Sequence, residues 1–97
     1  MATLAVEVTV AKGAHSSLVA IDGMVVHLDP LGQGTAAVAG SCGDGSQHML
    51  IAGFEGPVGA TMAVAVTCAG ATVCEIKAIT ITASREPFGG THRSFKL

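Results

Sequence analysis

Residues 18–28, LVAIDGMVVHL, decide the fold class of this 97-residue chain. Asp22-Gly23 stands between two apolar runs, and this dipeptide is a strong signal for a two-residue β-hairpin because a type I′ turn needs positive φ at both central positions. The turn predicts that Ile21 pairs with Met24 and that the pairing continues outward along both runs. Since side chains alternate along a strand, the following positions share one apolar face: Val19, Ile21, Met24, Val26 and Leu28.

The same alternation predicts strands on both sides of the hairpin. Residues 4–10 alternate most regularly, and their apolar side is formed by Leu4, Val6, Val8 and Val10. Further strands are predicted over residues 35–42, 47–54, 60–68 and 73–83. In the last of these the apolar positions change face after Ile76, which predicts a β-bulge near Lys77-Ala78.

About seven short strands with glycine- and proline-bearing turns predict an all-β domain, either an antiparallel sandwich or a small β-barrel. The number of strands resembles an immunoglobulin-like sandwich, and this is the class we expect. The sequence lacks the buried tryptophan and the widely spaced cysteine pair of antibody domains, so the resemblance implies a fold and no function. Residues 1–84 are expected to form a single sandwich domain, and residues 85–97 a polar C-terminal tail or a short edge strand.

The composition excludes several classes of protein. Hydrophobic residues make up 49% of the chain and charged residues 12%, so the chain has ample apolar surface to bury and is not disordered. A net charge of −2 argues against a nucleic-acid partner, which needs clustered lysine and arginine. No apolar run reaches the ~20 residues of a membrane-spanning helix, so a transmembrane protein is not expected. With no tryptophan or tyrosine, the chain has few aromatic platforms for sugars or single-stranded nucleic acid.

The scarcity of charge also bears on the surface and the compartment. A soluble monomer usually carries roughly 25–35% charged residues on its surface, whereas here threonine, serine, alanine and glycine must cover the outer faces. Burial of a neutral face in a homo-oligomer explains this, and so does a secreted domain with a threonine-rich surface. Residues 1–10 have no basic start and alternate like a strand, so no signal peptide is expected in this chain. The compartment is left open, because a secreted or periplasmic protein can lose its precursor segment.

The three cysteines are Cys42, Cys68 and Cys74. On a hairpin that closes through residues 69–73, Cys68 and Cys74 lie opposite each other on one face, at the cross-strand spacing of ~4.5–5.5 Å that suits a disulfide. Two buried free thiols are the alternative, because cysteine is among the most buried residue types. In both cases the predicted role is structural.

Two other groupings contain chemistry-bearing residues. Cys42 and His48 flank a loop that contains Asp44, and a cysteine–histidine dyad needs such a third group to orient the histidine. A six-residue separation across a turn is, however, common by chance. His27 and Asp29 share a strand face but lack the further ligands of a metal site. We therefore expect no catalytic residue, no cofactor and no metal, and the chain is not expected to be an enzyme.

The leading expectation for function is a non-catalytic β-sandwich that acts through protein–protein contacts, as a self-associating subunit or as an accessory module beside a partner. It follows from the neutral outer faces and the high apolar content. The alternative is a small-ligand or glycan-binding module whose site lies in the loops at one end of the sandwich. Those loops carry Asp29, Asp44 and Glu55, whose carboxylates suit Ca²⁺, although no regular Ca²⁺-loop spacing is present.

Overall fold

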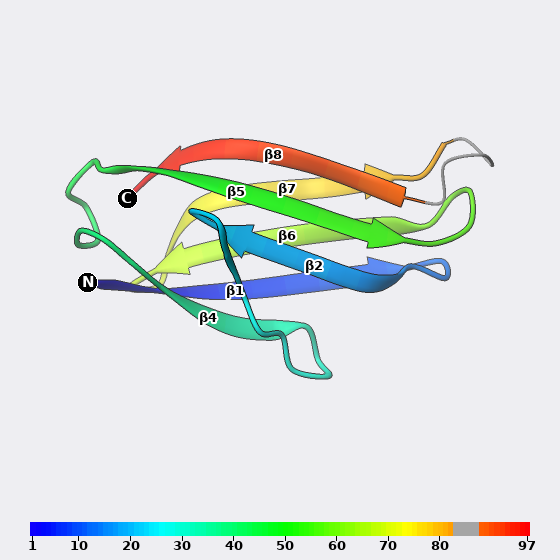
Figure 1. The fold of residues 1–97 in the computed structure, drawn as a ribbon, viewed down its shortest axis with the longest axis horizontal. Helices are drawn as coiled ribbons and strands as arrows, with labels where there is room; N and C mark the ends of the chain where they lie inside the picture. Colours follow the sequence, from blue (N-terminus) through cyan, green and yellow to red (C-terminus); the bar gives the residue numbers. More distant parts are fainter. Residues whose placement is uncertain (83–87) are drawn as a thin grey trace.

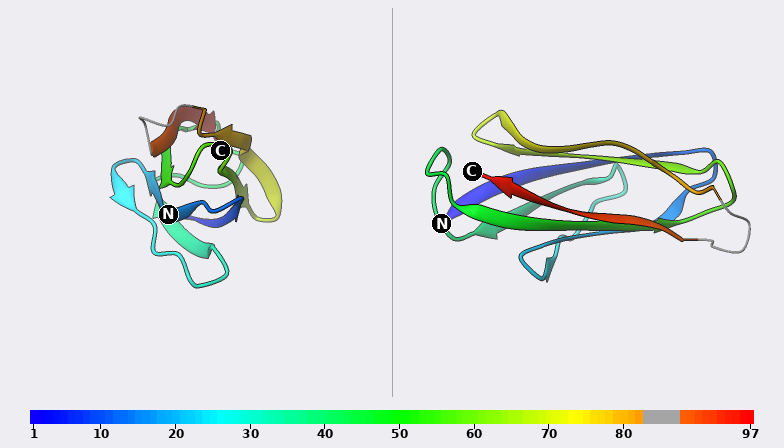
Figure 2. Two further views of the ribbon diagram at one scale, coloured as in Figure 1. Left: turned by 90° about the vertical axis from the view of Figure 1, so that its right-hand side faces the viewer. Right: turned by 90° about the horizontal axis from the view of Figure 1, so that it is seen from above.

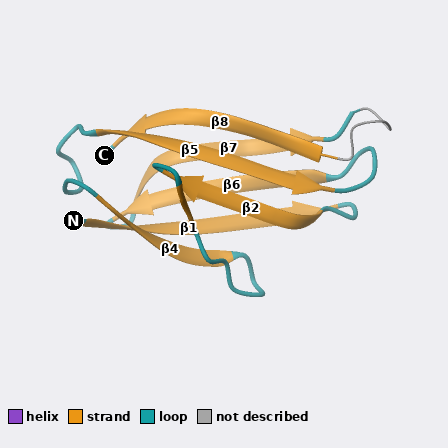
Figure 3. Cartoon of the chain, in the orientation of Figure 1, coloured by secondary structure: helices purple, strands orange, loops and turns teal. Residues whose placement is uncertain are grey.

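The computed structural model of the protein describes residues 1–82 and 88–97, which form two antiparallel sheets and contain no helix (Figure 1; Figure 3). One sheet, which we call the β1 sheet, has the order β4-β1-β6-β7, and the other, the β5 sheet, has the order β3-β2-β5-β8. The all-β prediction is confirmed, with eight strands among the described residues in place of about seven. The strands are β1 (Ala2–Ala11), β2 (His15–Ile21), β3 (Met24–Val25), β4 (Gln33–Val38), β5 (Gln47–Glu55), β6 (Thr61–Cys68), β7 (Ala71–Thr80) and β8 (Phe88–Lys96).

The two sheets enclose one apolar core, an arrangement compatible with a β-sandwich, and Figure 2 shows their strands running along the same long axis. Alternate side chains of the central strands point inward, as the two-residue period requires. Burial of each large aliphatic side chain stabilises the fold by about 1.5–3 kcal/mol relative to its exposure. The buried side chains of the central strands include Leu4, Val6 and Val8 of β1, Leu50, Ala52 and Phe54 of β5, and Met62, Val64 and Val66 of β6.

The predicted hairpin around Asp22-Gly23 is present but short. Ile21 pairs with Met24, as predicted, and both turn residues have positive φ, 51° at Asp22 and 80° at Gly23. Strand β3 ends at Val25, and one further backbone hydrogen bond, from the Val26 amide to the Val19 carbonyl at 2.8 Å, continues the predicted pairing before the chain leaves the β5 sheet and runs toward β4 in the other sheet (Figure 1). There the backbone approaches Gly34 so closely that a Cβ atom at that position would lie 2.5 Å from the His27 carbonyl oxygen. The glycine allows the chain to cross between the sheets.

Strand β7 is irregular at two places. Its register against β6 shifts between the partners of Met62 and Val64, which confirms the bulge predicted near Lys77-Ala78. A second shift lies between the partners of Val66 and Thr67. The turn before β7 has only two residues, Ala69-Gly70, both with positive φ. Consequently Cys68 pairs with Ala71, and Cys74 lies opposite Val66.

The C-terminal segment forms an edge strand. Of the two expectations for residues 85–97, the structure has the edge strand over Phe88–Lys96, paired along β5, while residues 85–87 lie outside the described residues. The guanidinium group of Arg93 donates a hydrogen bond to the backbone carbonyl of Glu75 in β7. This contact links the edge strands of the two sheets on one side of the molecule.

Candidate functional site

The disulfide differs from the predicted one. Cys68 is bonded to Cys42, with a Cα–Cα distance of 5.7 Å, and Cys74 is a free, buried cysteine. The predicted Cys68–Cys74 pair fails because the tight Ala69-Gly70 turn sets Ala71, not Cys74, opposite Cys68. Burial raises the pKa of the Cys74 thiol above its ordinary value. The bridge fastens the loop between β4 and β5 to the end of β6.

Cys42 is in that loop because β4 ends earlier than predicted. The expected strand over residues 35–42 is β4 at Gln33–Val38, and the chain turns at Gly40, where φ is 102°. A Cβ atom at Gly40 would lie 2.5 Å from Asp44 Oδ2 and 2.8 Å from Ser46 Oγ. Only a glycine leaves room for the polar loop that folds over it.

Within this loop Asp44 organises the backbone. Its Oδ2 atom accepts a hydrogen bond from the Ser41 amide and its Oδ1 atom one from the Ser46 amide, both at 2.8 Å. The Ser46 hydroxyl, the Ser46 amide and the Ser41 amide lower the pKa of Asp44 to about 2. The C-terminal residue Leu97 is also fastened to the loop, because its amide donates to the Ser46 carbonyl and its carbonyl accepts from Gly45, each at 3.0 Å.

His48 is the centre of a three-residue polar chain. It points inward from β5 with 6% of its surface exposed, and it is the only buried polar residue among those that the structure describes. Its Nδ1 atom lies 2.6 Å from Asp22 Oδ2, and its Nε2 atom lies 2.9 Å from Ser46 Oγ. Asp22 is held in turn by the Met49 amide, which donates to Oδ1 at 2.9 Å. The order serine–histidine–aspartate is that of an activated hydroxyl with its base and its positioning group.

The proton positions in this chain follow from its partners. An ionised Asp22 can only accept, so His48 Nδ1 carries a proton. With a neutral ring, Nε2 then has a free lone pair, and it competes with Asp44 to accept the single proton of the Ser46 hydroxyl. With a protonated ring, Nε2 donates to Ser46 Oγ, and the hydroxyl proton turns to Asp44, its other acceptor. The hydrogen bond from His48 and that from the Met49 amide lower the pKa of Asp22.

The Cys42–His48 dyad considered from the sequence is not formed, and His48 instead contacts Ser46 and Asp22. Cys42 is occupied by its disulfide and is no thiolate nucleophile. His48 is oriented by Asp22 rather than by the nearby Asp44, and Ser46 takes the place at Nε2. The Ser46-Gln47-His48 spacing was visible, since alternate residues at the start of a strand share a face. The contact with Asp22 depends on the sheet pairing of β2 with β5.

The carboxylates predicted at loop ends serve the backbone or lie at the surface. Asp29 Oδ1 accepts hydrogen bonds from the Leu31 and Gln33 amides, both at 2.9 Å, and so closes the loop before β4. Glu55 is the last residue of β5, and its Oε2 atom lies 4.0 Å from Nδ1 of His15. Over residues 1–82 and 88–97 there is no group of three histidine, cysteine, aspartate or glutamate residues placed to hold a metal ion.

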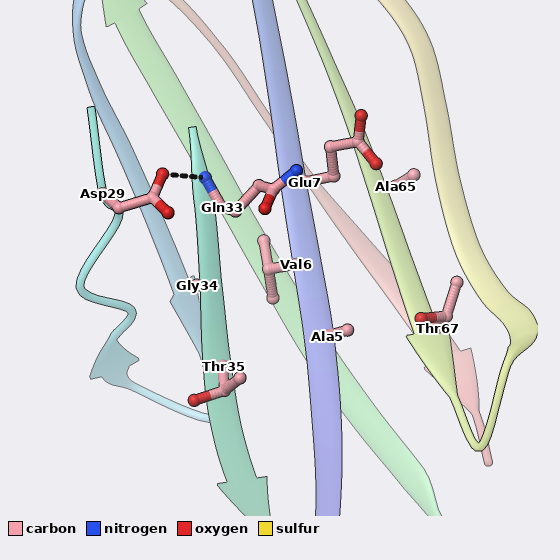
Figure 4. Close-up of a pocket in the computed structure, with 9 residues that line it drawn as sticks. All are labelled: Ala5, Val6, Glu7, Asp29, Gln33, Gly34, Thr35, Ala65 and Thr67. Carbon is pink, nitrogen blue, oxygen red and sulfur yellow. Dashed lines mark hydrogen bonds between the residues drawn. The ribbon is translucent and has the colours of Figure 1, made fainter. Parts of the chain in front are cut away.

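A hollow of about 480 Å³ lies on the outer face of the β1 sheet and over its edge (Figure 4). Small side chains form much of its floor, among them Ala5 and Ala65. Glu7 and Asp29 lie on opposite sides of Gln33, and the backbone N–H of Gln33 donates a hydrogen bond to Asp29 Oδ1 (Figure 4). None of the residues that line the hollow belongs to the polar chain of Ser46, His48 and Asp22.

The outer face of the β5 sheet carries large apolar side chains instead. Val25, Ala20 and Ile51 are cross-strand neighbours in one row over β3, β2 and β5. Val25 is 57% exposed and Ile51 47%, and Leu18 and Met49 flank the row at 47% and 38% exposure. We call the set Leu18, Ala20, Val25, Met49 and Ile51 the apolar face. Contiguous exposed apolar groups of this kind mark interaction sites.

Comparison with known proteins gives no further guide: no family model, no curated protein and no solved structure matches the chain. In the part of the chain that the structure describes, no helix has the length and apolarity needed to cross a membrane.

Proposed function

We propose that the protein is a non-catalytic β-sandwich that acts through protein–protein contacts, as a self-associating subunit whose interface is the apolar face of the β5 sheet. The observation that carries the proposal is the unbroken row Val25-Ala20-Ile51 across three strands, with its outer side chains about half exposed. Packing of such a face against an identical one would remove several large apolar side chains from water, at about 25 cal/mol per Å² buried.

The charges around the apolar face favour a second copy as the partner. The five residues of the apolar face contain no ionisable side chain, but their row continues to the exposed His92 of β8, the partner of Ile51, and a two-fold axis along this row would place the two copies of His92 near each other. Along β5, Ile51 lies midway between Gln47 and Glu55, and Lys96 of β8 is the partner of Gln47. A two-fold axis across the strands at Ile51 would set Glu55 of one copy near Lys96 of the other. A symmetric interface is self-complementary in this way.

Light scattering during size-exclusion chromatography tests the proposal. We expect a mass of about twice 9.6 kDa that falls toward 9.6 kDa on dilution. Val25→Thr keeps the shape of the side chain and adds a hydroxyl to the apolar face, so it should weaken the dimer by about tenfold. Val58→Thr is the matched control, because Val58 is similarly exposed at 54% but lies in the turn after β5. A monomer at high concentration, or equal effects of the two variants, would contradict the proposal.

The orientation of the two copies has its own test. Glu55→Lys should weaken the dimer by placing two lysines together, and the double variant Glu55→Lys with Lys96→Glu should restore it. If the double variant is as weak as the single one, the antiparallel arrangement is wrong even when a dimer forms. The immunoglobulin-like form of the sandwich stays a prediction. In the observed topology β1 and β2 lie in different sheets, whereas the first two strands of an immunoglobulin domain are neighbours in one sheet, so the strand order does not support that form.

A further inference from the structure

Ser46 lies in a loop that four separate contacts hold in place. The disulfide at Cys42 fastens one side of the loop to β6, and the Leu97 amide binds the Ser46 carbonyl. Asp44 binds the Ser46 amide, and the Ser46 hydroxyl itself meets His48. Ser46 is only partly buried, so part of the residue is accessible to solvent. A hydroxyl held against its base in this way needs little reorganisation to react.

We propose that Ser46 is an activated nucleophile that accepts an acyl group from small esters or thioesters with good leaving groups. His48 acts as the general base, through the 2.9 Å contact of Nε2 with Ser46 Oγ. Asp22 is a positioning residue, because it fixes the ring and keeps the proton on Nδ1 through the 2.6 Å contact. The proposal is independent of the apolar face, which contains none of these three residues.

The step balances without a further reactant. Ser46 Oγ gives its proton to His48 Nε2 and forms a bond to the acyl carbon of the donor. The bond from that carbon to the leaving oxygen or sulfur breaks, and the leaving group takes the proton from Nε2. The products are O-acyl Ser46 and the free alcohol or thiol, and His48 is again neutral. Nothing is oxidised or reduced.

The surroundings of Ser46 favour acylation over turnover. A positioned general base accelerates such a reaction by about 10²–10⁴-fold, whereas loss of one oxyanion donor in an enzyme costs about 10²–10³-fold. The Ser41 and Ser46 amides, two donors of the same loop, already bind Asp44 and are not free to stabilise an oxyanion. Acylation and the later hydrolysis of the acyl group each pass through a tetrahedral intermediate, and the oxyanion of the second intermediate likewise has no free amide donor from this loop. The acylated protein should therefore accumulate, with one acyl group on each chain.

Mass spectrometry of the native protein treated with p-nitrophenyl acetate tests this inference. We expect one acetyl group on each chain, located on Ser46 by peptide mapping. His48→Gln should slow the acetylation by about 10²-fold or more, and Ser46→Ala should abolish it. Ser41→Ala is the matched control, because it removes a hydroxyl from the same loop and keeps the amide that Asp44 binds; it should react as the wild type does.

Two measurements keep the result clear if His48→Gln is poorly folded. Wild-type protein unfolded in urea should lose the selective reaction at Ser46, since the contact with His48 exists only in the fold. Asp22→Asn should slow acetylation, and nitrogen NMR of the His48 ring should show that the proton no longer resides only on Nδ1. The inference is wrong if acetyl groups appear on lysines, the N-terminus or His48 instead. It is equally wrong if Ser46 reacts at the same rate in folded wild type, unfolded wild type and His48→Gln.

Discussion

His48 Nδ1 lies 2.6 Å from Asp22 Oδ2, although 26 residues separate the two in the sequence. The contact joins the first residues of β5 to the turn between β2 and β3, and the amide of Met49 adds a second bond to the same carboxylate. Because an ionised Asp22 accepts both bonds, protonation of this carboxylate weakens two of the contacts between the turn and the strand, while the backbone bond from the Asp22 amide to the Met49 carbonyl remains.

Acid should therefore destabilise this end of the molecule. Hydrogen bonds from His48 and the Met49 amide lower the pKa of Asp22 below 3.8, and bonds from Ser46 and Ser41 lower that of Asp44 to about 2. A depressed folded-state pKa stabilises the protein fully above the unfolded-state value and loses this effect as the pH falls through the folded-state value. The urea midpoint should thus fall between about pH 4 and pH 2.

The matching variants show whether these two carboxylates are responsible. Asp22→Asn and Asp44→Asn should each lower the urea midpoint at neutral pH and flatten its decline in acid. Glu7→Gln, which changes an exposed carboxylate on β1, serves as the control. If the urea midpoint falls with pH equally steeply in all three variants, other groups govern the acid transition.

Reduction of the Cys42–Cys68 bridge should lower thermal stability. The two cysteines are 26 residues apart, and closing a loop of this length stabilises the fold by about 3.5 kcal/mol in the chain-entropy model. For a domain of this size the melting temperature should fall by about 15–25 °C in Cys42→Ser with Cys68→Ser. Thiol counting gives the control: unfolded, unreduced protein should show one thiol, from Cys74. A mapped Cys68–Cys74 bridge would contradict the structure.

Gly89 sets the space between β8 and the core. A Cβ atom there would lie 2.5 Å from Cε1 and 2.8 Å from Cζ of the buried Phe54 ring. Gly89→Ala should therefore destabilise the protein by about 1–3 kcal/mol. Gly53→Ala is the matched control on the neighbouring strand, since a Cβ there meets only the Gly89 carbonyl oxygen at 3.5 Å. In a Phe54→Leu background, which shortens the ring contact, Gly89→Ala should cost less; an unchanged cost would show that the ring is not the cause.

Arg93 should hold the edges of β7 and β8 together. Its guanidinium donates to the Glu75 carbonyl, and hydrogen bonds from charged donors contribute about 1.5–3 kcal/mol when buried and less at an exposed site such as this one. Arg93→Ala should increase amide hydrogen exchange in β7 and leave exchange in β1 unchanged. Arg93→Lys can keep the charge but not the planar donor group, so it should restore only part of the protection. An equal increase in amide exchange in β1 and β7 would instead indicate that the substitution lowers the stability of the whole fold.

Much of the fold could be predicted from alternation alone. The strands around Leu4 and Met62 and the Ile21–Met24 pairing follow from residues that are neighbours in the sequence. The bulge near Lys77-Ala78 was visible as a change in which side of the strand is apolar. These features are local, because each depends on side-chain period or on turn chemistry within a few residues.

The candidate site was less predictable, because it depends on contacts between distant segments. The disulfide was assigned to the wrong pair since the turn after Cys68 is two residues long, with Ala69 at a positive φ that alanine rarely adopts. The sequence marks Asp22 only as a turn residue, and its side chain reaches His48 through the pairing of β2 with β5.

The interrupted register of β7 has a consequence for concentrated solutions of the protein. A long outer strand offers a row of open backbone groups on which further chains can add and grow into fibrils. Two bulges and the charged residues Glu75 and Lys77 make β7 a poor template for such growth. The opposite edge of the same sheet, β4, has no charged residue over Gln33–Val38, and fibril growth would begin there.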